Sequence, residues 1–103
     1  MMNEKTRAYV NKVAKIVATN PAITKAVVVG LATQKNYTFG DDKIQLAVFT
    51  KPEAKYTTVC VDLNNALFDN DLTMVDLYMT ADEDFYAEVY NLLDTGEVIF
   101  ERK

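Results

Sequence analysis

The chain has 103 residues, of which 50% are hydrophobic and 25% charged, and its net charge is −4. This length fits one domain over residues 1–103, and the apolar content is too high for a disordered segment. Histidine is absent and Cys60 is the single cysteine, which excludes a histidine-dependent catalytic triad, an internal disulfide and a cysteine-built metal site. No apolar run approaches the roughly 18 residues of a membrane span, and the first residues do not read as a signal peptide, so we expect a cytoplasmic protein without membrane contact.

The charges are unevenly distributed along the chain. Residues 1–59 contain nine Lys/Arg and four Asp/Glu (net +5), whereas residues 60–103 contain two Lys/Arg and eleven Asp/Glu (net −9). A basic first half could face phosphate and an acidic second half a basic partner, although charge runs more often keep a domain soluble. Because the overall balance is acidic, we do not expect a nucleic-acid-binding protein.

The first half of the chain predicts one helix and two strands. Apolar residues at three- and four-residue spacing predict a helix over residues 3–19, which Asn20-Pro21 ends. A β-branched run predicts a buried strand over residues 23–32, with Gly30 where the chain opens into a polar loop over residues 33–42.

The second strand, predicted over residues 43–50, alternates between apolar and polar residues. Its apolar positions, Ile44, Leu46 and Val48, should point to one face, and Lys43 and Gln45 to the other.

The second half adds a helix, a strand, a helix and a strand. Residues 55–68 are ambiguous, because strand-forming residues overlap an apolar repeat every four residues; we favour a helix. A strand follows over residues 72–79. Thr80 or Asp82 can cap a last helix that buries Phe85, Val89, Leu92 and Leu93.

Gly96 is expected to close this last helix in the left-handed conformation, and a short strand over residues 98–100 follows. The order helix, strand, strand, helix, strand, helix, strand predicts an α+β fold, with a mixed four-stranded sheet and three helices packed on it.

Several stretches together resemble the minimal nucleotidyltransferases of the polymerase-beta-like superfamily. They are residues 27–31 (Val-Val-Val-Gly-Leu), 36–40, 44–48 and 75–77, followed by a helix and the segment 92–100. In that family a strand ends in Gly-Ser, the next strand carries an Asp-x-Asp pair, and a later strand carries a third Asp. The three carboxylates hold two divalent cations that bridge the nucleotide phosphates and activate the attacking hydroxyl. The resemblance implies a nucleotidyltransferase-like fold.

The sequence departs from the family pattern at these positions. Leu31 stands at the family's serine. When the second strands are aligned on their apolar residues, Lys43 and Gln45 stand at the paired aspartates, and Asp76 alone is retained.

A competing register, counted from Gly30, puts Asp42 at the first aspartate and Ile44, which cannot ligate a metal, at the second. We prefer the first register, because a slip of one residue would turn the apolar side chains to the wrong face.

Either register leaves the chain without an Asp-x-Asp pair, so we predict no catalytic residues, no metal site and no cofactor. The remnant of the family's site is a vestigial pocket formed by Gly30, Leu31, Asp42, Lys43, Gln45 and Asp76. Lys43 could hold a phosphate or an acidic group as a point charge, or it could be a solvated residue paired with Asp76 or Asp42.

Three hypotheses follow. The chain is a catalytically inactive protein that acts by binding, possible partners being a helical toxin of the HEPN type, as the family resemblance implies, or a second copy of the chain. Alternatively, it is an active nucleotidyltransferase with an unusual ligand set from Asp41, Asp42 and Asp76, or a purely structural, self-associating domain. Whether a nucleotide binds is left open by the sequence.

Overall fold

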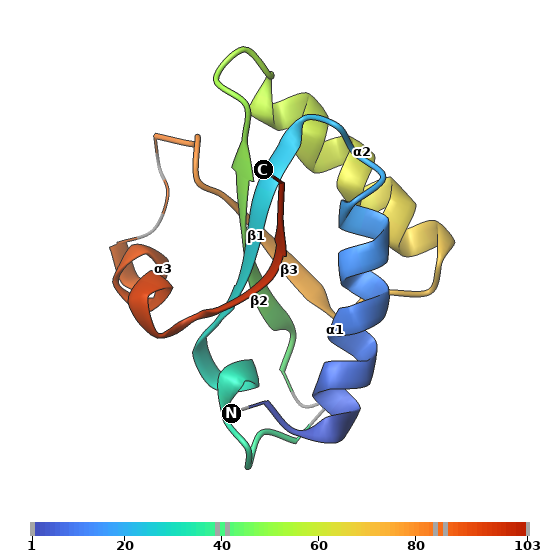
Figure 1. Cartoon of the computed structure of the whole chain (residues 1–103), viewed down its shortest axis with the longest axis vertical. Coiled ribbons are helices and arrows are strands. Elements are labelled where there is room, and N and C mark those ends of the chain that lie inside the picture. Colours follow the sequence, from blue (N-terminus) through green and yellow to red (C-terminus); the bar gives the residue numbers. More distant parts are fainter. Residues whose placement is uncertain (1, 39, 41, 84, 86, 103) are drawn as a thin grey trace.

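The computed structural model describes residues 2–38, 40, 42–83, 85 and 87–102. The helices are α1 (Glu4–Val17), α2 (Tyr56–Asp69) and α3 (Ala87–Leu92), and the strands are β1 (Ile23–Val29), β2 (Ile44–Thr50), β3 (Val75–Met79) and β4 (Glu97–Glu101). Two short 3-10 turns, η1 (Gly30–Thr33) and η2 (Leu93–Thr95), follow β1 and α3. The predicted mixed α+β class and the predicted order of helices and strands are confirmed (Figure 1).

The four strands form one mixed sheet in the order β3-β2-β1-β4. Strand β1 is antiparallel to both β2 and β4, whereas β2 and β3 are parallel. A parallel pair needs a long crossover connection, and α2 supplies it. The register places Gln45 opposite Asp76 and Leu46 opposite Leu77.

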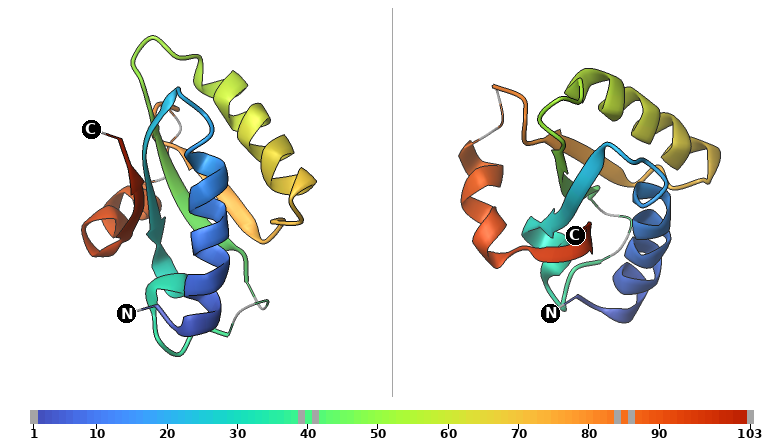
Figure 2. Two further views of the ribbon diagram at one scale, coloured as in Figure 1. Left: turned by 45° about the vertical axis from the view of Figure 1, so that its right-hand side comes forward. Right: turned by 45° about the horizontal axis from the view of Figure 1, so that its top comes forward.

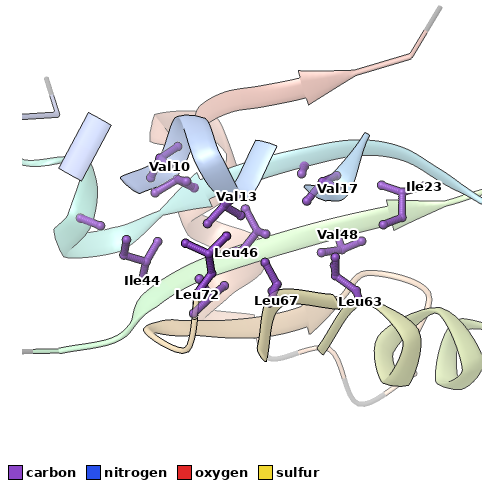
Figure 3. Close-up of a cluster of buried hydrophobic side chains, with 14 of the residues drawn as sticks. Val10, Val13, Val17, Ile23, Ile44, Leu46, Val48, Leu63, Leu67 and Leu72 are labelled. Atoms are coloured by element: carbon purple, nitrogen blue, oxygen red, sulfur yellow. The ribbon is translucent and has the colours of Figure 1, made fainter. Parts of the chain in front are cut away.

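The helices lie on both faces of the sheet. Helices α1 and α2 cover one face and α3 covers the other (Figure 2). Valines of α1 and leucines of α2 meet the buried side chains of β2 in the larger apolar cluster (Figure 3). Ile44, Leu46 and Val48 belong to this cluster, whereas Ala47 belongs to a smaller cluster under α3, so the predicted alternation along β2 is confirmed.

Side-chain hydrogen bonds fix the start of α1 and the residue that precedes β3. Asn3 caps α1, since its Oδ1 accepts a hydrogen bond from the Thr6 amide at 2.9 Å. The Tyr9 hydroxyl accepts one from the Met74 amide at 2.8 Å, which ties α1 to the residue before β3.

No helix in the described part of the chain is long and apolar enough to cross a membrane.

Several predicted boundaries were wrong. Strand β1 ends at Val29, not at Ala32, because Gly30 takes a φ of +75° and begins a 3-10 turn. Strand β3 begins only at Val75, after Asp71 turns the chain with a φ of 59°. Helix α3 begins at Ala87 rather than near residue 80 or 82.

The expected left-handed cap at Gly96 is also wrong. Gly96 has a φ of −72°, in the extended region. Its lack of a side chain serves packing instead, because a Cβ there would lie 2.6 Å from Val27 Cγ1 and 2.9 Å from the Val28 carbonyl oxygen.

Candidate functional site

One pocket of about 280 Å³ lies where β1 ends and β2 and β3 begin; we call it the strand-end pocket. Its lining consists of Val29, Leu31, Ala32, Asp42, Lys43, Gln45 and Asp76. Five of the six residues predicted for the vestigial pocket are in this lining. The sixth, Gly30, is adjacent, since a Cβ at Gly30 would overlap Gln45 Oε1. The structure therefore brings all six predicted residues together.

Strand geometry explains this convergence. Alternation along β2 turns Ile44 and Leu46 into the larger cluster, so Lys43 and Gln45 project to the opposite face. The parallel register then sets Gln45 beside Asp76 of β3.

The turn at Gly30 brings the end of β1 to the same place. Leu31, which the resemblance aligns with the family's serine, is 64% exposed. Leu31 has no hydroxyl with which to hold a phosphate.

An ion pair lies in the lining of the strand-end pocket. Lys43 Nζ lies 3.7 Å from Asp76 Oδ1, and the two side chains are 54% and 48% exposed. Gln45 Nε2 donates a long hydrogen bond of 3.5 Å to the Tyr78 hydroxyl. Of the two interpretations of Lys43, pairing with Asp76 is therefore present in the structure, and it leaves the half-exposed ammonium accessible to solvent.

The acidic groups of this region do not form a metal site among the residues that the structure places. Within that part of the chain, no group of three or more Asp, Glu or Cys side chains could hold a metal ion. Asp41, which the hypothesis of an active enzyme uses, lies outside the described residues. Asp42 is exposed, and its carbonyl oxygen accepts a hydrogen bond from the Tyr37 hydroxyl.

A second pocket, of about 390 Å³, was not predicted from the sequence; we call it the edge pocket. It lies where α2 begins and β3 ends, on the outer edge of the sheet. Its lining consists of Tyr56, Thr57, Cys60, Val61, Leu77, Tyr78, Met79, Asp82 and Phe85. Aromatic rings and one carboxylate thus surround a largely apolar hollow.

Cys60 is half-buried, packs against the larger apolar cluster and lines the edge pocket. Burial, and secondly the negative charge of Asp82, raises the pKa of the Cys60 thiol. The thiol is therefore mostly protonated near neutral pH, which makes it a weak nucleophile.

The outer face of α2 carries large apolar side chains that the sequence analysis also missed. Val61 is 57% exposed and Phe68 is 70% exposed. Residues seven apart lie on one face of a helix, two turns from each other. The available signal was that both residues fall outside the four-residue repeat of Val59, Leu63 and Leu67, which are buried.

Two comparisons with known proteins bear on the family. No protein-family model matches the chain, and a search of curated proteins found no match. Membership of the nucleotidyltransferase family therefore stays a prediction that rests on the residues quoted above.

Proposed function

We propose that the chain is a catalytically inactive nucleotidyltransferase-like protein that acts by binding a partner protein. The observation that carries this proposal is the Lys43–Asp76 ion pair in the strand-end pocket. A site for two divalent cations needs several carboxylates. Here the single carboxylate retained from the family pattern faces an ammonium group instead of a metal ion.

The lysine also opposes a cation directly. A divalent ion about 4 Å from the ammonium would be repelled by about 2 kcal/mol even at the dielectric constant of water, and by more in a less solvated site. Gln45 offers one amide oxygen in place of a carboxylate. These groups support loss of metal-dependent nucleotidyl transfer.

The surface supports binding to another protein. Val61 and Phe68 are exposed apolar side chains on one face of α2, and a partner that covered them would remove this apolar surface from water. β3, one of the two edge strands, lies beside this helix.

Charge favours a basic partner. Residues 60–103, which include most of α2 and all of β3, carry a net charge of −9. Two such acidic surfaces would repel each other, which favours a different protein over a second copy. A helical toxin of the HEPN type, which the family resemblance implies, is the partner class that we propose to test first.

The catalytic part of the proposal is tested with purified protein, nucleotides and magnesium or manganese. We expect no transfer of radiolabelled nucleotide to the chain or to a candidate partner. We also expect no thermal shift, whereas a ligand at 100 times its dissociation constant adds about 2.7 kcal/mol of stability. Metal-dependent transfer of label would overturn the proposal and support the active-enzyme hypothesis.

The binding part is tested by co-expression with a candidate helical toxin of the HEPN type, followed by size-exclusion chromatography. We expect a stable complex that Val61→Glu/Phe68→Glu disrupts. Tyr90→Glu/Asn91→Glu is the matched control, because it adds the same charge at two exposed positions of α3, on the other side of the sheet. A chain that stays monomeric and unbound would instead favour a purely structural domain.

A further inference from the structure

The edge pocket combines two features that attract organic cations. Tyr56, Tyr78 and Phe85 contribute aromatic rings, whose faces carry negative electrostatic potential. Asp82 contributes a carboxylate to the same lining.

The described lining contains neither lysine nor arginine. Lys55 precedes the lining residue Tyr56 in the chain, but it is exposed and is not part of the lining. The chain does stack basic groups on rings elsewhere: Lys25 Nζ lies 5.4 Å from the Phe49 ring centre, and Arg102 lies 5.1 Å from that of Phe100.

We propose that the edge pocket binds an arginine or lysine side chain of a partner protein. Aromatic rings and a carboxylate together suit a guanidinium group best, because it stacks on rings and pairs with carboxylates. The inference rests on the proposed function in one respect, namely that the occupant belongs to a protein.

The position of the pocket supports a protein occupant. Val61 both lines the pocket and belongs to the exposed apolar face of α2. A partner segment lying along α2 would cover Val61 and Phe68 and could place a basic side chain in the pocket at the start of the helix. At protein interfaces, a few buried side chains surrounded by other contacts often supply most of the binding energy, and arginine is frequently one of them.

Cys60 allows the charge preference of the pocket to be measured without the partner, because it is the single cysteine of the chain and lines the pocket. Methanethiosulfonate reagents form a mixed disulfide with it and release methanesulfinate. The rate constants of a trimethylammonium reagent and of a sulfonate reagent of similar size are compared. Their ratio reports the local potential, since the same thiolate reacts with both and its pKa cancels.

We expect the cationic reagent to react roughly ten times faster than the anionic one, because the Asp82 carboxylate in the same lining attracts the cation and repels the anion. Asp82→Asn should reduce this ratio at least threefold. Asp62→Asn is the matched control: it removes the same charge from the exposed side of α2 and should leave the ratio unchanged.

A second measurement uses a side-chain probe. Blocked arginine (Nα-acetyl-arginine methylamide) at millimolar concentration should slow modification of Cys60 by an uncharged reagent. Blocked citrulline, which has nearly the same shape but no charge, should not. Asp82→Asn should weaken the protection.

Three results would each overturn the inference. The first is a ratio of cationic to anionic rate constants near one, and the second is a ratio that Asp82→Asn leaves unchanged. The third is equal protection of Cys60 by blocked arginine and blocked citrulline. These outcomes are separate from the failure of the proposed function. If the complex with a partner forms but the pocket shows no preference for cations, this inference is wrong and the proposed function stands. A pocket that selects cations in a chain that binds no protein removes the proposed function and, with it, the assignment of the occupant.

Discussion

Replacing Lys43 and Gln45 together by aspartate tests whether the strand-end pocket has the geometry of a nucleotidyltransferase metal site. Both side chains line the pocket, and Gln45 lies opposite Asp76 in the parallel β2–β3 register. The double variant K43D/Q45D would therefore bring three carboxylates to one end of the sheet. Oxygen ligands of this kind and number are what divalent cations require.

The electrostatic cost of this change follows from the ion pair. At 3.7 Å and about half exposed, Lys43 and Asp76 attract each other by about 1 kcal/mol at a water-like dielectric. The substitution at position 43 replaces this attraction with a repulsion of similar size, and the new carboxylate at position 45, opposite Asp76, adds a second repulsion. Without metal, the free energy of unfolding of K43D/Q45D should therefore fall by about 3 kcal/mol.

Millimolar Mn²⁺ or Mg²⁺ should restore the stability of K43D/Q45D, as measured by chemical denaturation with and without the metal. Asn11→Asp/Lys12→Asp is the matched control, because it changes the charge by the same amount at two exposed positions of α1. A metal-dependent gain no larger than that of the control or the wild type would refute the proposed geometry of the site.

Three further predictions concern stability and are checked by chemical denaturation. Gly96→Ala should lower the free energy of unfolding by about 1–3 kcal/mol, because its Cβ would lie 2.6 Å from Val27 Cγ1; an equal loss in a Val27→Ala background would contradict a clash with that side chain. Thr6→Val should raise it by about 1 kcal/mol, since the fully buried Thr6 hydroxyl has no hydrogen-bond partner among the described residues; Thr6→Ser, which keeps the hydroxyl, should give no gain. Burial raises the pKa of both Cys60 and Tyr9, so the fold favours their neutral forms. Their contribution to stability is complete below the ordinary pKa values of 9.0 and 10.0, and it is lost as the pH rises through the pKa values of the folded state. Cys60→Ser should therefore lose less stability than the wild type as the pH first rises above 9.0, and identical pH profiles would contradict this assignment.

Helices and strands were predictable from the sequence where the buried residues recur at the spacing of one type of secondary structure. Residues 56–61 have the composition of a strand, but a strand would put polar Asn65 on the same face as Val59, Leu63 and Leu67. A helix turns Asn65 to the opposite side, where it is exposed, and buries the three apolar residues. The same reasoning gave the alternation of β2. In both segments, burial on one face overrode the local preferences of individual residues.

The glycines show where local reasoning fails. Gly30 and Gly96 both follow predicted elements, so each is expected to turn the chain. Gly30 does so with a φ of +75°, whereas Gly96 is extended and makes room for Val27 and Val28 of a neighbouring strand. A glycine can be required either because the backbone takes a positive φ or because a neighbouring chain leaves no room for a side chain. The second requirement depends on which strand lies alongside, and the sequence does not show that.

The two pockets differ in predictability for a related reason. The strand-end pocket follows from one constraint on β2, because Ile44 and Leu46 must face the core and so Lys43 and Gln45 must face away.

The edge pocket has no such constraint. It joins the start of α2, the end of β3 and the residues that follow, and its position depends on β3 being an edge strand. The sequence carries one partial signal, the apolar residues Val61 and Phe68 outside the buried repeat of α2. The core does not account for these two side chains, so their exposure on one helix face is the observation on which the proposed partner surface rests.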